Sequence, residues 1–482
     1  MLLMESPRTP YHLSALVLFD PPPGAAPDFA RKLHESLRSH SRAVPPFNFQ
    51  LTEQGAPVRA TPAWREVEHI DTSYHLPYVE LAEAGSAGLQ AEIARLEAVP
   101  LERTRPLWQC VFVDGLGGGR FAWYIKLHMC LLDLLVGVGR LAGGFSAVPR
   151  PDSFAPFWAL AAKTPQQAAG LRVPGLSKRL AQQVQALSGG YGSLGAAIAR
   201  SALQARQTVQ HDAPDIPAVP PGTASRHDSN VRVARTFALD ESCVARIAAA
   251  ADTTADCVLL ALWGGALRRR LIARDALPEQ SLTVCTPVDL ARMGRTELEF
   301  RMSAAVLPLA TDVADPAQRL FAIHAAMAEA GRRLRELSHR NLEVYTGRLL
   351  LPFIVRELSY DDEVPPLANL SFARLPGLAE AQYFGTARVA ELYQLPSLLD
   401  GQFLGIGAMK YAGQYAMGML MSAHRDFCAD ELVAALFESC DELAGALDLD
   451  FGELPGAGNL ADSMQRRGCG QCSAAAAAMR PQ

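Results

Sequence analysis

The residues best suited to chemistry in this chain follow an apolar segment at 121–127 and begin with His128. The segment has the length and composition of a buried strand. Asp133 follows five residues later, where a helix is expected to begin. An imidazole can act as a general base because its pKa lies near neutral pH. The next residue, Met129, carries a thioether that cannot take a proton from an alcohol. His128 and Asp133 are therefore the candidate site residues, and Met129 adds no acid–base chemistry.

Each candidate has a structural alternative. His128 is compatible with a core histidine bonded to the backbone, which is the commoner case, and Asp133 with a structural ion pair. Cys130 has no evident base and fits a small buried hydrophobe better than a nucleophile. The glycines at 117–119 fit a hairpin turn rather than a phosphate-binding loop, because no helix follows them. Cys469 and Cys472 have the spacing of a redox motif without a surrounding fold.

Composition limits the class of protein. The 482 residues exceed what one hydrophobic core usually supports, and 49% of them are hydrophobic, which is enough for two cores. The net charge of −5 gives no reason to expect nucleic acid as a partner. No segment has the uncharged apolar length of a membrane span or of a signal peptide. Nine cysteines without metal-like spacing indicate reduced thiols, hence a cytoplasmic location, and no metal site.

Strand and helix patterns alternate along the chain, which predicts an α/β fold. A Pro-rich segment at 211–230 is the expected linker. We predict an N-terminal domain at 1–145, a helical and Pro-rich connection at 146–230, a C-terminal domain at 231–455 and a disordered tail at 456–482. Strands are expected at 11–19, 110–113, 121–127, 231–238, 281–288, 304–309, 367–372 and 414–421. Helices are expected at 28–40, 89–99, 131–142, 165–187, 191–210, 315–337 and 429–447, with two more within 240–270.

Five segments in order support a family resemblance: 9–21, 100–108 with its Pro106-Leu107-Trp108 sequence, 121–133, 311–320 and 398–402. With them the chain resembles the bacterial wax ester synthase/acyl-CoA:diacylglycerol acyltransferase family over residues 4 to 448. That family is related to the chloramphenicol acetyltransferase and peptide-synthetase condensation folds. Its residues before the first strand are largely absent here, so the expectation is that this chain starts late or that its start codon is misplaced.

The resemblance implies two similar α/β domains with a tunnel at their junction. Acyl-CoA would be the co-substrate, diacylglycerol or a long-chain alcohol the acceptor, and no cofactor is needed. In the family motif His-His-x-x-x-Asp-Gly the second histidine is the general base, the aspartate is structural, and the glycine leaves room beside the base. Here these positions are Met129, Asp133 and Leu134. Pro106, Leu107 and Trp108 are implied as weak candidates for substrate binding, although packing is the commoner role of such a tryptophan.

Other polar family positions are also changed. The departures fall at 254–257, 287–291 with Arg292 beside them, 299–301, Arg374 and Gly405. Two functions therefore remain open. The first is an O-acyltransferase of triacylglycerol or wax ester synthesis with weak or lost activity. The second is a non-catalytic protein that binds acyl-CoA or lipid, or regulates an active paralogue. Peripheral contact with the inner membrane or lipid inclusions is the alternative to a purely cytoplasmic location, and the basic residues at 268–270 and 332–333 are either solvated helix faces or contacts for anionic groups.

Overall fold

The computed structural model describes residues 2, 5, 9–52, 63–132, 134–151, 155–161, 219–220, 231–289, 302–338, 341–342, 345–346, 349, 356, 366–422 and 427–450. Several expected features lie outside these residues. They are Asp133, the helices expected at 165–187 and 191–210, most of the linker at 211–230, the cysteines at 469 and 472, and the tail at 456–482.

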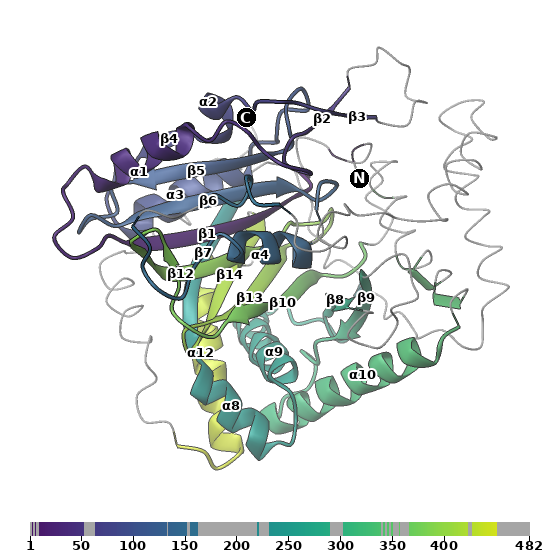
Figure 1. Ribbon diagram of the computed structural model, residues 1–482. Helices are drawn as coiled ribbons and strands as arrows, with labels where there is room; N and C mark the ends of the chain where they lie inside the picture. The colour runs from purple at the N-terminus through teal and green to yellow at the C-terminus, as the bar shows by residue number, and fades with distance from the viewer. Residues whose placement is uncertain are drawn as a thin grey trace, which may run out of the picture. The chain divides into compact units, whose positions relative to one another are not determined.

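The first sheet has six strands in the order β11–β12–β1–β6–β5–β4 (Figure 1). They are β1 (His12–Asp20), β4 (Tyr78–Glu80), β5 (Trp108–Asp114), β6 (Phe121–His128), β11 (Tyr383–Phe384) and β12 (Ala387–Leu395). Strand β1 pairs antiparallel with both β6 and β12, and β4 lies parallel to β5. The expected hairpin joins β5 to β6, and Gly117 and Gly118 in its turn have positive φ angles, which glycine adopts without strain.

One face of β6 is apolar because successive side chains of a strand point to opposite sides. Phe121, Trp123 and Ile125 are buried in the hydrophobic core on that face. Helix α1 (Phe29–Arg38) covers it, with the rings of Phe29 and Phe121 6.2 Å apart. Helix α4 (Leu134–Ala142) adds Leu141 to the same core. The other face of β6 is polar and carries the candidate site.

The second sheet also has six strands, in the order β7–β14–β13–β10–β8–β9. They are β7 (Arg232–Asp240), β8 (Thr283–Asp289), β9 (Met302–Pro308), β10 (Leu370–Leu378), β13 (Leu404–Tyr411) and β14 (Gln414–Ser422). Strand β8 is parallel to β10 and antiparallel to β9, so the sheet is mixed. A two-residue turn, Ala412 and Gly413, joins β13 to β14 with both φ angles positive, as tight hairpins require. A small sheet pairs β2 (Phe49–Leu51) with β3 (Trp64–Glu66).

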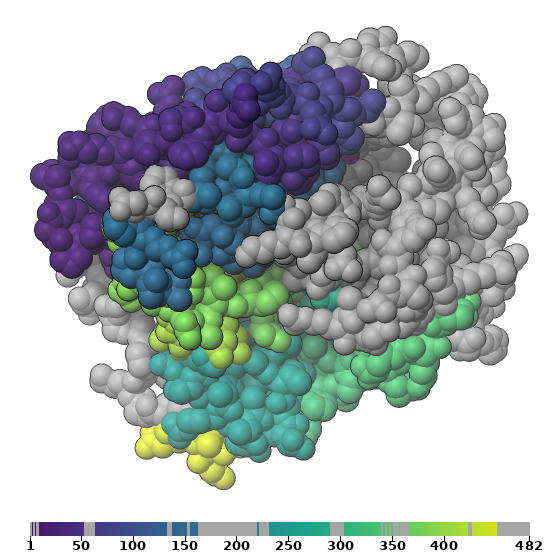
Figure 2. All heavy atoms as spheres, viewed as in Figure 1, coloured from purple at the N-terminus to yellow at the C-terminus, as the bar shows by residue number. Residues whose placement is uncertain are grey.

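Four helices alternate in sequence with the strands of the second sheet: α8 (Glu241–Ala250), α9 (Ala255–Ala273), α10 (Pro316–Glu336) and α12 (Ala429–Ala446). Helix α9 contacts the other three and is buried along most of its length (Figure 1). Atoms of the α8–α9 segment and of α12 also lie side by side in the space-filling view (Figure 2). The helices start where the sequence provides caps: Thr254 accepts from the backbone of Cys257, and Asp315, followed by Pro316, accepts from that of Gln318.

The remaining described helices are α2 (Thr72–His75) and α3 (Ser86–Glu97). No single helix in the described part of the chain has the length and apolar composition to cross a membrane. The pair α8 and α9, bent by 100° at the break between them, passes together on length and composition alone.

The chain forms two compact units. The first contains Met1–Arg172, Arg374–Ser397 and Gly407–Leu420, and the second contains Val173–Ala373, Leu398–Ile406 and Met421–Gln482. This division differs from the linear domain boundaries expected from the sequence. The reason is β12, which pairs with β1 from Ser14 to Asp20 and so places a late segment in the first unit.

Candidate active site

His128 ends β6 and its side chain is 1% exposed. The backbone N–H of Cys130 donates to Nδ1 of His128 over 3.1 Å. A neutral ring therefore carries its proton on Nε2. That nitrogen lies 3.4 Å from Oε1 of Glu5, and neither atom has a closer hydrogen-bond partner. Both ring nitrogens of His128 thus face groups of the protein.

Glu5 is held from its other side by Arg103, whose Nη2 donates to Oε2 over 3.0 Å. The same guanidinium group donates to the backbone carbonyl of Leu2 over 2.6 Å. Burial raises the pKa of Glu5, but hydrogen bonding and charge from His128 and Arg103 outweigh burial and lower that pKa to about 2. The carboxylate is therefore ionised at neutral pH, and its Oε1 faces Nε2 of His128.

The two residues directly after His128 offer no replacement base. Met129 is half-buried, and its backbone N–H donates to the carbonyl of Tyr11 over 2.9 Å. Burial raises the pKa of Cys130 to about 12, so the thiol is protonated and a poor nucleophile at neutral pH. Asp133 lies outside the described residues, and its expected ion pair stays a prediction.

The polar face of β6 continues as a buried row next to His128. His12, the strand neighbour of His128, is within 2.7 Å of the Glu97 carboxylate, from its Nε2 to Oε2. Lys126 donates from Nζ to the carbonyl oxygens of Leu96 and Val99 at the end of α3, over 2.9 and 2.6 Å. Burial lowers the pKa of Lys126 to about 8, although the charge of Glu97 opposes that shift.

The site residues predicted from the sequence did not include Glu5, His12, Glu97 or Lys126. A signal for His12 and Lys126 exists in the sequence, because Ser14 and both of these residues occupy alternate positions in otherwise apolar strands. Such alternation places the polar side chains on one face. Glu97 has no comparable signal, since it comes from a helix whose position depends on tertiary packing.

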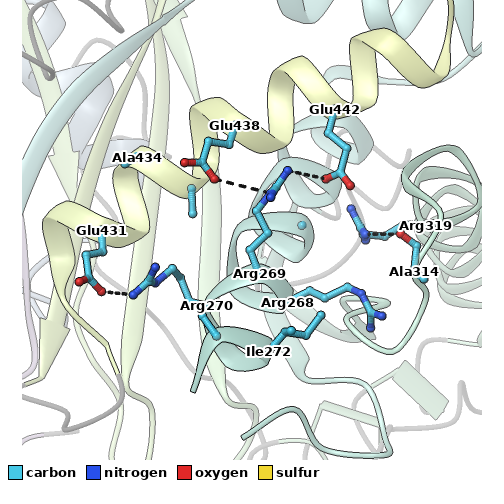
Figure 3. A pocket seen from close by; sticks show the side chains of 13 residues that line it. Arg268, Arg269, Arg270, Ile272, Ala314, Arg319, Glu431, Ala434, Glu438 and Glu442 are labelled. Atoms are coloured by element: carbon cyan, nitrogen blue, oxygen red, sulfur yellow. Dashed lines mark hydrogen bonds and ion pairs between the residues drawn. The ribbon is translucent and has the colours of Figure 1, made fainter. Parts of the chain in front are cut away.

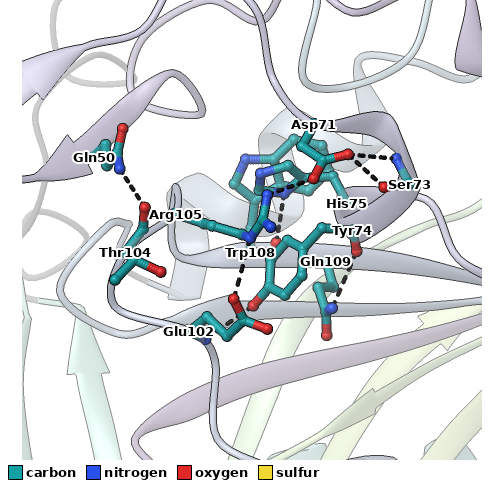
Figure 4. Close-up of polar contacts among 10 residues, drawn as sticks. All are labelled: Gln50, Asp71, Ser73, Tyr74, His75, Glu102, Thr104, Arg105, Trp108 and Gln109. Carbon is teal, nitrogen blue, oxygen red and sulfur yellow. Dashed lines mark hydrogen bonds and ion pairs between the residues drawn. The ribbon is translucent and has the colours of Figure 1, made fainter.

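The segment Pro106-Leu107-Trp108 is buried in the first unit. The Trp108 indole N–H donates to the carbonyl of Phe47 over 2.8 Å, and the ring stacks with Trp158 at 5.4 Å between centroids. Nδ1 of His75 lies 2.8 Å from the Trp108 carbonyl oxygen, and the two rings are 4.4 Å apart (Figure 4). Trp108 is thus a core residue in this structure, and its contact with substrate stays a prediction.

Arg105 fixes the same segment from the surface. It bonds to Asp71 and, over 3.1 Å, to Glu102 (Figure 4). The Tyr74 hydroxyl accepts from the backbone N–H of Glu102 over 2.8 Å. These contacts tie the loop before β5 to α2, which gives the family sequence at this place a structural role.

The segment Asp400-Gly401-Gln402 also has a structural role. Asp400 pairs with the buried Arg356, from Oδ2 to Nε over 2.6 Å. Gly401 has a φ of +81°, and a Cβ there would lie 2.6 Å from a carbon of Pro366. Gln402 is fully buried. Only glycine fits this turn without strain or collision.

Four of the departures lie at least partly within the described residues: 254–257, 287–289 at the end of β8, Arg374, and Gly405, which is buried in β13. Thr254 caps α9, so the expected helix start is kept. Arg374 is exposed on β10. Arg292 and the segment 299–301 lie outside the described residues.

Comparison with known proteins decides the family. Residues 1–258 match the wax ester synthase/diacylglycerol acyltransferase catalytic domain, and residues 301–444 match the WS/DGAT C-terminal domain. The chain belongs to this family. A Mycobacterium tuberculosis protein named "Probable diacyglycerol O-acyltransferase" is 31% identical over 461 residues, covering 93% of this chain and 98% of that protein. The resemblance inferred from the five sequence segments is confirmed.

Comparison with solved structures identifies the fold. The wax ester synthase/diacylglycerol acyltransferase of Marinobacter aquaeolei superposes with a TM-score of 0.73 at 23% identity, covering 93% of this chain and 97% of that one. The first condensation domain of the calcium-dependent antibiotic synthetase superposes with a TM-score of 0.50 at 15% identity, covering 92% of each chain. The expected α/β fold with two similar domains, which this family shares with condensation domains, is confirmed.

Proposed function

We propose that this protein is an acyl-CoA-dependent O-acyltransferase of neutral lipid synthesis whose turnover is weak or lost. Acyl-CoA would be the donor, and diacylglycerol or a long-chain alcohol the acceptor. The support for these substrates is the family and the name of the mycobacterial relative. The proposal further assumes a cytoplasmic protein that can contact lipid surfaces.

The observation that carries the proposal is the placement of His128 beside Met129. In the family motif the base stands at position 129, where a thioether cannot accept a proton. His128 is 1% exposed, receives a backbone hydrogen bond on Nδ1 and faces Glu5 with Nε2. To act on an acceptor hydroxyl it would have to break these contacts and turn. General-base catalysis contributes ~10²–10⁴-fold in rate, so its loss alone would lower turnover by about that factor.

A non-catalytic role in binding acyl-CoA or lipid, or in regulating an active paralogue, is the second candidate. The same placement of His128 favours it. The two candidates differ in one measurable respect, because the first requires product and the second requires only saturable binding.

The experiment measures both with the purified full chain. Labelled acyl-CoA is incubated with diacylglycerols and long-chain alcohols, and acyl-CoA binding is titrated at equilibrium. We expect saturable binding with ester formation near the rate of a protein-free reaction. Ester formation at the rate of an active family member would contradict the loss of activity. The absence of saturable acyl-CoA binding would contradict both the transferase and the acyl-CoA-binding role.

A further inference from the structure

A pocket in the second unit is lined mainly by charged side chains. Its volume is about 530 Å³, and it lies between α9, α12 and the segment that leads into α10 (Figure 3). Four arginines and three glutamates line it: Arg268, Arg269, Arg270, Arg319, Glu431, Glu438 and Glu442. The formal charge of these side chains is +1, and the pocket is far in sequence from His128.

Two of the arginines form ion pairs between the helices. Arg270 of α9 pairs with Glu431 of α12. Arg269 lies 3.7 Å from Glu438 and 3.8 Å from Glu442, so both of its contacts are longer than hydrogen bonds (Figure 3). These two residues therefore explain how α9 and α12 are held together.

The other two arginines have no carboxylate within ion-pair distance in the described part of the chain. Arg268 donates from Nη1 to the carbonyl oxygens of Thr311 and Asp312 over 2.7 and 3.2 Å. Arg319 is 2% exposed and donates to the carbonyl oxygens of Val313 and Ala314 over 3.0 to 3.3 Å. A buried cation that contacts only neutral oxygens has lost its hydration without gaining a counter-charge, which is unfavourable.

Further donors beside the pocket are unused. The Nε of Arg270 and the hydroxyl of Ser439 are buried without a hydrogen-bond partner. A Cβ on Gly265 would lie 2.0 Å from the Ser439 hydroxyl and 2.7 Å from Nη1 of Arg319, so both groups crowd this glycine of the pocket wall. Burial lowers the pKa of Arg319, while the charge of Glu442 opposes the shift. The guanidinium stays protonated, because arginine does not deprotonate in proteins.

We propose that this pocket binds a phosphomonoester group, with Arg268 and Arg319 as its main ligands. A dianionic phosphate has oxygen acceptors in several directions and fits guanidinium groups that come from two different helices. The volume leaves room for an attached organic group, and Ile272, 53% exposed at the rim, offers it an apolar contact. The phosphate could belong to a soluble ester or to a lipid headgroup.

The test is calorimetric titration of the full chain at low ionic strength with inorganic phosphate, pyrophosphate and glycerol 3-phosphate. A parallel arm measures co-flotation with vesicles of phosphatidic acid in phosphatidylcholine, against phosphatidylcholine alone. Saturable binding of the soluble ligands assigns the site to soluble esters, and binding to the phosphatidic acid vesicles alone assigns it to a headgroup.

Three variants show whether the pocket is responsible. Arg268→Gln removes one ligand, and Ala434→Leu narrows the pocket without changing any charge (Figure 3). Arg332→Gln is the matched control, because Arg332 lies on α10 outside the pocket and pairs with Glu329 and Glu336. We expect roughly tenfold or greater loss of affinity in Arg268→Gln, as for removal of a charge-assisted hydrogen bond. Ala434→Leu should also weaken binding, because its larger side chain occupies space that the ligand needs, and the control should show no change.

Two results would overturn the proposal. One is no saturable binding of any ligand or vesicle, and the other is an equal loss in Arg332→Gln, which would indicate unspecific attraction. Circular dichroism of each variant shows that it is folded. The test needs no transferase activity, so its outcome is independent of the function proposed above.

Discussion

The proposed alignment with the family motif puts Met129 and Leu134 at the positions of a histidine and a glycine. If the imidazole were the only missing group, Met129→His would raise transferase activity by up to ~10²–10⁴-fold. We expect the single variant to stay near background, because the same alignment also replaces the motif glycine and several other polar family positions. Initial rates with labelled acyl-CoA and diacylglycerol are the measurement.

The double variant Met129→His with Leu134→Gly should be more active than the single one but still poor. Met129→Gln is the matched control, since it is polar and has no basic nitrogen. Ordinary turnover by Met129→His alone would show that the other substitutions are harmless. The effects of substitutions at catalytic residues that act together are not additive. The test is therefore the ranking of the activities of these variants rather than the sum of their individual effects.

His75 makes stability depend on pH. Burial lowers its pKa to about 4, while its hydrogen bond to the Trp108 carbonyl opposes the shift. The unfolded chain therefore takes up a proton near pH 6.5 and the folded protein only near pH 4. As the pH is lowered from about 6.5 to about 4, the free energy of unfolding should therefore decrease by up to ~3 kcal/mol. Above this range, His75 should not affect stability.

Urea unfolding at pH 4 to 8 measures this dependence. His75→Asn, whose side-chain amide can still donate to the Trp108 carbonyl, should reduce the slope between pH 6.5 and 4. The exposed His69, changed to Asn, should leave it unchanged. An unaltered slope in His75→Asn would mean that the acid sensitivity arises elsewhere.

Among single residues, the sequence identified His128 but not its surroundings. An imidazole after an apolar strand is visible in the sequence, and its burial is compatible with the core alternative considered there. The facing Glu5 could not be predicted, because its contact with His128 spans more than 120 residues. Such pairs follow from tertiary packing and leave no local pattern.

At the scale of elements, two glycines with similar φ angles allow the cost of backbone strain to be distinguished from the cost of a steric clash. Gly401 and Gly413 have φ angles of +81° and +83°, but only Gly401 has an atom within 4 Å of a Cβ position. Gly413→Ala should cost about 1 kcal/mol for the left-handed conformation. Gly401→Ala should cost about 2–4 kcal/mol, because overpacking against Pro366 is added.

Thermal and urea unfolding of the two variants give the comparison. A larger loss in Gly401→Ala, with the Asp400–Arg356 pair disturbed, is the expected result. Equal losses would show that Pro366 moves aside and that this turn tolerates a methyl group at low cost.

Most long elements could be predicted from periodicity, but β12 and β13 were missed. In β12, Glu391 pairs with Leu18 and Val389 with Phe19, so Ala390 is an extra residue that breaks the alternation. In β13, glycines lower the strand propensity. Gly407 is needed there because a Cβ would lie 2.4 Å from the Gln394 carbonyl oxygen.

Pro376 and Gly377 form a sequence that is typical of a turn. In the structure, however, both residues lie inside β10. The proline is tolerated because the pairing of β10 with β8 is confined to Leu370 and Ser371. Gly377 is required by close packing, since a Cβ there would lie 1.7 Å from the Lys410 carbonyl oxygen. A Pro-Gly pair therefore does not always indicate a turn. Inside a strand, glycine can be required by the close approach of the backbone of a neighbouring strand.

For the whole molecule, the division into units predicts how fragments behave. The piece 1–230 lacks β12, so β1 would lose one of its two neighbours and expose an unpaired edge. We expect this fragment, expressed alone, to aggregate or to lack a cooperative unfolding transition. Co-expression with the piece 231–482 should restore a soluble complex.

Size-exclusion chromatography and thermal unfolding of the fragments provide the measurement. A monomeric fragment 1–230 with a sharp transition would contradict the assignment of β12 to the first unit. Family and fold class could be predicted from short landmarks such as Trp108 and Gly401, whose packing or backbone demands one residue type. The assignment of a late strand to the first unit could not, because the sequence gives no signal for pairing between distant strands.

The pairing of β1 with β12 also sets a condition on synthesis. Asp20 and Arg388 face each other across 368 residues. At ~5–20 residues per second, a ribosome needs roughly 20–70 s to make the chain between them. During that interval the nascent first unit presents the bare edge of β1 to every neighbouring polypeptide. Cells that make this protein quickly and in quantity would need a chaperone to shield that edge until the strand that covers it has emerged.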